Sequence, residues 1–235
     1  MVAGESPYRP RGLLPQGWGM AAAMPLWHRL ISEKPPPIKG VTPREVGSME
    51  GLTEKQRELL VGSLLGDGHL RPHGGGVVFE FLQSPKRRFY VEWKHRLLGD
   101  LACPQIHHQS GEREYYKLVT KTHPELEELY RLFYREGRKT VPEEISKMLT
   151  PFALAVWFMD DGSKSRNAVY FNTQAFTVQE QFRLIKALKR FYLIANLNRD
   201  GEYHRLRLLK RCNRRFLELV RPYILKEFEY KLPTP

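Results

Sequence analysis

Two aspartates, Asp67 and Asp161, each close an apolar stretch and are each followed by glycine. The stretches run over residues 60–68 and 154–162. A carboxylate at the C-terminal end of a helix is repelled by the helix dipole, so each acid requires a compensating cation. Two carboxylates that lie close together cannot both stay ionised without a cation. Because Mg²⁺ and Ca²⁺ prefer oxygen ligands of this kind, the pair predicts a divalent metal site.

A helix start signal precedes each acid. Thr53 with Gln56 three residues later forms a capping box, in which each side chain bonds the other's backbone N–H. Thr150 followed by Pro151 is an N-cap with proline at the first helical position. The sequence therefore predicts two helices that each end at a motif acid.

Small residues lie where these two helices can touch. Gly62 and Gly66 are one turn apart on the first helix, and Ala153 and Ala155 open the second. Side-by-side packing would bring both acids to the same end of the helix pair. The glycine that follows each acid is expected to adopt a positive φ and stop its helix.

The chain also repeats a glutamine and a lysine at similar distances from each acid. Gln83 follows the first acid by 16 residues, and Gln174 follows the second by 13. Lys139 follows the first acid by 72 residues, and Lys231 follows the second by 70. The matched set predicts a duplicated chain with pseudo-twofold symmetry.

These paired stretches resemble the two motifs of the LAGLIDADG homing endonucleases in their single-chain form. The second block is the closer match, over residues 149–151, 157–162, 172–174 and 230–233. The first block departs from the family motif at Ser63 and Leu65, but its Gly-Asp-Gly ending is intact. The resemblance covers the chain from Leu52 to Pro235.

The resemblance implies an α+β fold of two pseudo-twofold αββαββα halves. Two antiparallel β-sheets would form a DNA-binding saddle, with the paired motif helices at the dyad. Residues 50–148 would be the N-terminal half and residues 149–235 the C-terminal half. Strands are expected at 77–82, 114–121, 168–172 and 203–210, and further helices at 85–98, 125–134, 142–148, 178–193 and 214–223.

The resemblance also implies the metal ligands. Asp67 and Asp161 would hold the cations, assisted by the backbone carbonyls of Gly66 and Asp160. Asp160 competes with Asp161 for the catalytic role, but the family acid is the one that adjoins the glycine. The other interpretation of both acids is a pair of helix-terminal carboxylates in turns.

The lysines and glutamines would complete the catalytic set. Lys139 and Lys231 would stabilise the charge that develops at phosphorus or polarise the attacking water. Gln83 and Gln174 would orient water around the metal. The alternatives are solvated lysines and glutamines that bond the backbone at strand ends.

Charge indicates the partner. A net charge of +12 and a pI of about 9.7 imply DNA, RNA or an anionic membrane surface. No apolar run reaches membrane-spanning length, so no membrane partner is expected. Basic residues on the strands, helix starts and loops would contact DNA, and the alternative is that they form a solvated charged face. The expected contacts are Arg71, Lys86, Arg87, Arg88, Lys117, Lys121, Lys164, Arg166, Arg205, Arg207 and Lys210.

Two amphipathic patterns set expected orientations. In residues 178–193 the apolar Phe182, Ile185 and Leu188 should face inward, with the basic Arg183, Lys186 and Lys189 outward. In residues 203–210 two leucines alternate with two arginines, so one face of that strand should be core and the other basic.

Zinc chemistry is not favoured by the sequence. Cys103 and Cys212 have no metal-type neighbours and are expected to be reduced thiols. Four histidines lie in the first half, but their spacing does not match a zinc site. They are His69, His73, His107 and His108.

Residues 1–49 differ from the rest of the chain. They are rich in proline and lack periodicity, which predicts an unstructured extension. A transit peptide and a leader translated from an upstream exon remain open.

Together these features predict a monomeric, Mg²⁺-dependent endonuclease that cuts both strands of DNA at a long asymmetric site. Mn²⁺ would substitute, and Ca²⁺ would bind without supporting cleavage. The enzyme would be encoded by an intron, promote the mobility of that intron, and act in an organelle, with the mitochondrion favoured over the chloroplast. One alternative is an RNA maturase that assists splicing of its own group I intron, and another is a non-catalytic DNA-binding repressor. Retention of both acids favours the nuclease.

Overall fold

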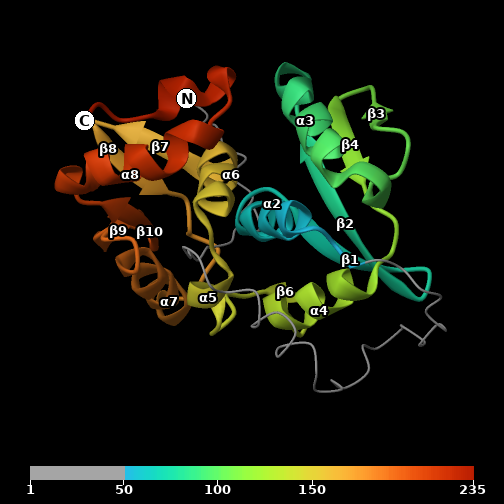
Figure 1. The fold of residues 1–235 in the computed structure, drawn as a ribbon, viewed down its shortest axis with the longest axis horizontal. Helices are drawn as coiled ribbons and strands as arrows, with labels where there is room; N and C mark the ends of the chain where they lie inside the picture. The colour runs from blue at the N-terminus through green and yellow to red at the C-terminus, as the bar shows by residue number, and fades with distance from the viewer. Residues whose placement is uncertain (1–50) are drawn as a thin grey trace, which may run out of the picture.

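The computed structural model describes residues 51–235, so the expected extension over residues 1–49 lies outside the described part. Two similar halves flank a central pair of helices, α2 and α6 (Figure 1). The first half contains α2 (Glu54–Leu65), β1 (His69–His73), β2 (Gly76–Gln83), η1 (Pro85–Arg87), α3 (Arg88–Leu98), η2 (Gly99–Leu101), β3 (His107–Gln109), β4 (Tyr115–Val119) and α4 (Pro124–Phe133). A connector follows, with β5 (Tyr134–Arg135), β6 (Arg138–Lys139) and α5 (Ile145–Met148). The second half contains α6 (Pro151–Asp161), β7 (Gly162–Ser165), β8 (Ala168–Phe171), α7 (Val178–Lys189), β9 (Ala195–Asp200), β10 (Tyr203–Leu208), η3 (Lys210–Cys212), α8 (Asn213–Val220), η4 (Arg221–Tyr223) and η5 (Lys226–Lys231).

The two halves share one topology. The sheets have the strand orders β1-β2-β4-β3 and β7-β8-β10-β9, and every pairing within them is antiparallel. Each half therefore runs αββαββα, as predicted. Among residues 51–235, no helix combines the length and apolarity needed to cross a membrane.

The edge strands of the two large sheets, β1, β3, β7 and β9, and the two-residue strands β5 and β6 were not predicted from the sequence. β1 contains Pro72, and β3 is only three exposed residues long, so neither shows a clear alternation. β7 is joined to β8 by Arg166 and Asn167, whose φ angles of 47° and 63° form a tight left-handed turn. Pairing with a neighbouring strand, which composition does not reveal, stabilises these short elements.

The close packing of α2 on α6 was predicted correctly. A Cβ atom added at Gly62 would lie 2.6 Å from the carbonyl oxygen of Ala153 and 2.7 Å from the Cβ of Val156. One added at Gly66 would overlap the side chain of Asp160. Glycine at these two positions therefore allows the helix backbones to approach closely. Both predicted N-caps are present, with the full capping box at Thr53.

The predicted positive φ of the glycines after the acids is wrong. Gly162 has a φ of −74°, and Gly68 is not among the residues with positive φ. A Cβ atom at Gly68 would lie 2.5 Å from the ring of Phe79, and one at Gly162 would overlap Phe158. These glycines are required by close packing beneath the acids rather than by a left-handed turn.

The predicted orientation of the helix at 178–193 is partly wrong. α7 ends at Lys189, and Phe182 is 55% exposed rather than inward. Gln181 is buried instead, where it accepts a hydrogen bond from Thr173 and donates one to the carbonyl of His204. The helix is rotated because these buried hydrogen bonds satisfy Gln181 inside. The inward positions of Ile185 and Leu188 were predicted correctly.

Candidate active site

Asp67 lies just beyond the C-terminal end of α2 and is half-buried. Its Oδ2 accepts a hydrogen bond from Nε2 of Gln83 at 2.5 Å. Its backbone N–H donates to Oδ2 of Asp160, 3.2 Å away on the partner helix. The structure thus brings Gln83 to the first acid and ties that acid to the end of α6.

Asp161 is the last residue of α6 and is buried. Its carbonyl accepts a hydrogen bond from the backbone of Asn172, which fixes the helix end against β8. Both motif acids act electrostatically on the same two lysines, Lys139 and Lys231. The two acids therefore gather at one end of the helix pair, where the sequence placed them.

Lys139 lies beside the backbone of the first motif. Its Nζ donates a 2.5 Å hydrogen bond to the carbonyl of Gly68. Burial lowers the pKa of Lys139 to about 7, against the attraction of Asp161 and Asp67, which raises it. Near neutral pH this lysine is therefore present in both protonation states.

Lys231 caps the end of α6. Its Nζ donates to the carbonyl of Met159 at 2.7 Å and lies 3.5 Å from that of Phe158. This is the cation that the helix dipole requires at its C-terminus. Burial and the charge of Arg87 together lower the pKa of Lys231 to about 8, against the attraction of the nearby acids.

Asp160 is occupied by a buried ion pair. Lys94 lies 2.9 Å from both of its carboxylate oxygens, and the hydroxyl of Tyr90 donates to it at 2.6 Å. Lys94 also donates to Oγ of Ser63 at 2.8 Å. Burial raises the pKa of Asp160 and lowers that of Lys94, in each case against the attraction within the pair. Because its side chain is engaged in this way, Asp160 is less suited than Asp161 to hold a metal.

Lys94 and Tyr90 were not identified from sequence. A signal was present, because both lie four residues apart on the buried stripe of α3 with Val91 and Leu98. A lysine within an apolar helical stripe indicates a buried carboxylate partner.

The second glutamine does not match the first. Nε2 of Gln174 donates to Oδ2 of Asp200 on β9 at 2.8 Å, so the amide bonds this acid rather than Asp161. Gln83 bonds a motif acid and Gln174 does not, which breaks the expected symmetry of the two glutamines.

The donor set fits a hard divalent cation. Within residues 51–235, no three His, Cys, Asp or Glu side chains gather as metal ligands. A cation would therefore rest on Asp67, Asp161 and the carbonyls of Gly66 and Asp160, with its other positions left to water or phosphate. Such a sparse all-oxygen set is typical of Mg²⁺, which keeps several waters and binds substrate phosphates.

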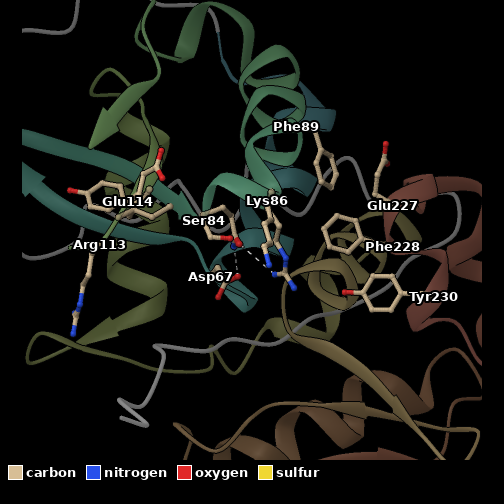
Figure 2. A pocket seen from close by; sticks show the side chains of 13 residues that line it. Asp67, Ser84, Lys86, Phe89, Arg113, Glu114, Glu227, Phe228 and Tyr230 are labelled. Atoms are coloured by element: carbon tan, nitrogen blue, oxygen red, sulfur yellow. Dashed lines mark hydrogen bonds between the residues drawn. The ribbon is translucent and has the colours of Figure 1, made fainter. Parts of the chain in front are cut away.

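A hollow of about 1010 Å³, lined by three basic and three acidic side chains, opens beside the first acid. Figure 2 shows Asp67 between Arg113 on one side and Phe228 and Tyr230 on the other, with Lys86 above it. Aromatic rings and basic groups, which single-stranded nucleic acid can contact, therefore alternate with carboxylates around this hollow.

Most of the predicted DNA contacts lie at the surface. Lys164 is tied to the carbonyl of Leu232 at 2.6 Å, and Arg88 is paired with Glu92 at 2.7 Å. Arg87, Lys117, Arg205 and Arg207 are half-buried, while Arg71, Lys86, Arg88, Lys121, Lys164, Arg166 and Lys210 are exposed.

The alternation of β10 was predicted correctly. Leu206 and Leu208 are fully buried, and Arg205 and Arg207 lie on the other face. The guanidinium of Arg205 lies 4.7 Å from the centre of the Tyr170 ring. The Nε atoms of both arginines are buried without an acceptor among the described residues.

Known proteins resemble this chain in sequence and in fold. Residues 57–216 match the model of the LAGLIDADG DNA endonuclease family. The cytochrome b mRNA maturase bI2 of Debaryomyces hansenii is 29% identical over 195 residues, which cover 77% of this chain and 74% of the relative. The DNA endonuclease I-ChuI of Chlamydomonas applanata is 28% identical over 208 residues, covering 77% of this chain and 95% of the relative.

Two further similar proteins show how much of a longer relative this chain spans and which fold it shares. RecA of Mycolicibacterium chitae is 30% identical over 240 residues, but this chain spans only 52% of that relative. The homing endonuclease I-WcaI bound to its DNA recognition sequence matches with a TM-score of 0.72 and 24% identity, covering 80% of this chain and 89% of that one. This likeness shows the shared fold.

Proposed function

Because the chain belongs to the LAGLIDADG DNA endonuclease family, we propose that it is a site-specific, metal-dependent endonuclease that hydrolyses both strands of duplex DNA. The observation that carries the proposal is the pair of motif acids. Asp67 and Asp161 come from different halves, and α2 and α6 bring them to one end of the dyad. A repressor built on the same fold would need the basic sheets but not the paired acids.

Asp67 and Asp161 would hold the divalent cations with the carbonyls of Gly66 and Asp160. When bound, Mg²⁺ would neutralise phosphate charge and lower the pKa of a bound water. Mn²⁺ would substitute, whereas Ca²⁺ would bind without supporting cleavage. With one acid from each half, a single chain suffices, and the active species is a monomer.

The neighbouring side chains would prepare the reaction. Gln83 donates to Asp67, and its amide oxygen, which accepts from Arg87 at 3.4 Å, has a second lone pair that can orient a water beside the first acid. Lys139 and Lys231 would stabilise the charge that develops at phosphorus. Gln174 bonds Asp200, so we assign its role to the second sheet rather than to the metal.

The basic surface would hold a long, asymmetric target. The hollow beside Asp67 carries Lys86, Arg87 and Arg113, and the second sheet presents Arg205 and Arg207. The two halves differ in these side chains, so the two half-sites that they read should differ as well.

The second candidate is an RNA maturase. It is supported by the similarity to cytochrome b mRNA maturases bI2 of Debaryomyces hansenii and Saccharomyces cerevisiae, both 29% identical. That similarity also favours origin in a group I intron of an organelle, with the mitochondrion ahead of the chloroplast. Maturase activity alone would not require both acids.

The test uses the purified chain and a library of random DNA duplexes. Binding in Ca²⁺ selects the target, and Mg²⁺ is then added to the selected duplex. The proposal requires cleavage of both strands at one position, with none in EDTA. Tight binding of a self-splicing intron RNA, without any selected duplex, would favour the maturase instead.

A further inference from the structure

The first sheet contains an acidic residue on the face opposite its core. In β2 the side chains of Phe79 and Phe81 are buried in the core, and Glu80 between them points to the other face. Glu80 is nevertheless only 4% exposed. It is buried because basic side chains surround it.

Three basic groups from two neighbouring strands contact Glu80. Nη2 of Arg71 on β1 lies 2.7 Å from its Oε1, and Nζ of Lys117 on β4 lies 2.8 Å from the same atom. Nε2 of His69, directly opposite in the β1–β2 pairing, lies 3.2 Å from Oε2. Arg71 and Lys117, two predicted DNA contacts, are therefore held by one carboxylate.

The cluster lines a hollow of about 570 Å³ on this face. Burial alone would raise the pKa of Glu80, but hydrogen bonds from Lys117 and Arg71 outweigh it and hold the pKa below its usual value. The carboxylate is thus ionised in the neutral range. An ionised acid on a surface for a polyanion opposes phosphate binding, so its presence there requires a compensating role.

The geometry of Arg71 indicates what that role is. The Nε and Nη2 atoms of its guanidinium face Oε1 of Glu80, at 3.3 Å and 2.7 Å. Nη1 makes two longer hydrogen bonds on the exposed side, one to the carbonyl of Pro72 and one to Nδ1 of His73, each at 3.4 Å. A guanidinium held along one edge keeps a fixed direction for its remaining N–H groups.

The second half contacts an arginine with a ring as well as a carboxylate, because Arg205 lies over Tyr170 and its Nη2 is 3.4 Å from Oδ1 of Asp200. Tyr170 on β8 lies opposite Ser163 on β7, two residues past Asp161, just as Glu80 lies opposite His69, two residues past Asp67. The guanidinium of Arg205 stacks over the Tyr170 ring. The same central position of each sheet therefore contacts an arginine, through an ion pair in one half and a ring in the other.

We propose that Glu80 is a specificity-determining positioning residue, which fixes Arg71 and Lys117 so that they read base edges in the major groove instead of binding phosphates. This rests on the proposed DNA-binding function. A fixed arginine can bond bidentately to O6 and N7 of guanine, whereas a free one loses rotamer entropy on binding and is attracted to any phosphate.

The decisive variant is Glu80→Gln, measured on the selected target and on scrambled duplexes. It preserves side-chain shape but removes the charge that holds the two cations. Affinity for scrambled DNA should rise, and the ratio of target to scrambled affinity should fall about tenfold. A new selection with this variant should lose base preference at one or two adjacent pairs only.

A matched control removes one carboxylate elsewhere. Glu128 on α4 pairs with Arg131 at 2.8 Å, on a helix that packs against the apolar face of the first sheet. Glu128→Gln makes the same change in net charge and should leave the affinity ratio unchanged. An equal fall in the ratio for both variants would overturn the proposal, because net charge alone would explain it.

Arg71→Lys tests the same base contact in a second way, which does not depend on the stability of the Glu80 variant. It should lose the same base preference, and adding Glu80→Gln to it should reduce specificity little further. If Glu80→Gln folds and keeps the full base preference of the wild type, the role of Glu80 is overturned. If Glu80→Gln does not fold, full base preference in Arg71→Lys overturns that role. Either result leaves the endonuclease proposal standing. Failure of the wild-type chain to prefer any duplex would overturn both.

Discussion

At the scale of single residues, the ion pair of Lys94 and Asp160 joins the two halves of the molecule. Lys94 belongs to α3, Asp160 to α6, and Ser63, which Lys94 also contacts, to α2. Through Asp160 the pair reaches the backbone N–H of Asp67. A buried charge network thus contacts the first motif acid through its backbone.

Removing one member of this pair should be costly. Lys94→Met leaves the carboxylate of Asp160 buried without its cation, which should reduce the free energy of unfolding by about 3–5 kcal/mol. Adding Asp160→Asn removes the stranded charge and should recover much of that loss. Urea unfolding of the single and double variants measures both. A loss below about 1 kcal/mol in the single variant, typical of a surface pair, would contradict this account.

Lys231 should make stability depend on pH. Its folded pKa of about 8 lies below the ordinary value of 10.5, so between these values the unfolded chain binds more protons. The free energy of unfolding should therefore rise with pH across this window, by at most about 3 kcal/mol from this residue.

The test measures the free energy of unfolding in urea for wild type and for Lys231→Met, at pH 7.5 and at pH 10.5, with EDTA present. The variant lacks this contribution, so the wild type should gain stability relative to it as pH rises. A constant difference between the two proteins at both pH values would show that Lys231 is not perturbed in the folded chain.

Much of the candidate site could be predicted at this scale, and the reasons for the rest are specific. Asp67 and Gln83 meet because a strand of the same half returns beside the motif helix. Gln174 was expected to behave alike, but Asp200, on a strand that sequence did not reveal, accepts its amide. Spacing along the chain predicts where a side chain lies in its half. It does not predict which other hydrogen-bond partners the tertiary structure brings to that side chain.

At the scale of elements, the α2–α6 contact determines where the acids lie. Gly62→Ala places a methyl group 2.6 Å from the carbonyl oxygen of Ala153, a backbone atom that cannot move aside cheaply. Overpacking should cost about 1–3 kcal/mol in unfolding free energy and displace the motif helices, so cleavage should fall as well.

A control substitution adds the same methyl group where only side chains are near. A Cβ at Gly51 would meet Arg57 and Glu125 side-chain atoms at 3.2 Å and 3.3 Å. Thermal unfolding and cleavage of Gly51→Ala should resemble wild type. Equal melting temperatures for Gly62→Ala and wild type would mean that the helices do not pack this closely.

The helices were predicted well because their signals are local. Capping residues and apolar runs define α2 and α6 without reference to the rest of the fold. The edge strands β1, β3, β7 and β9 depend on pairing with distant segments, and residues such as Pro72 obscure their pattern. The rotation of α7 also depends on a tertiary contact, the buried hydrogen bonds of Gln181.

At the scale of the whole molecule, charge and duplication act together. The chain carries a net charge of +12 and presents basic residues on both sheets. The similar spacing of acid, glutamine and lysine predicted two halves of like topology, and the strand orders confirm it. The side chains on the outer faces of the two sheets differ between the halves. Local sequence alone does not predict which of these side chains contact one another.

DNA binding should depend strongly on salt. Log affinity should fall with log salt by about 0.9 for each phosphate neutralised. If Arg205 or Arg207 binds a phosphate, its replacement by alanine should lower this slope by about one. If it reads a base, the replacement should weaken discrimination at one base pair by roughly 1–3 kcal/mol. Arg131→Ala, on α4, is the control and should change neither. Wild-type slope and specificity in both β10 variants would remove that strand from the interface.

The central claim is that the two motif acids, one from each half, are jointly required to cut DNA. The most direct measurement compares wild type with Asp67→Asn and Asp161→Asn on the selected duplex in Mg²⁺. The account predicts that both variants fold and bind the target with affinity near or above wild type, because an anionic group near phosphate has been removed. Neither should cleave both strands. Cleavage of both strands at the wild-type rate by either variant would contradict the assignment of the active site.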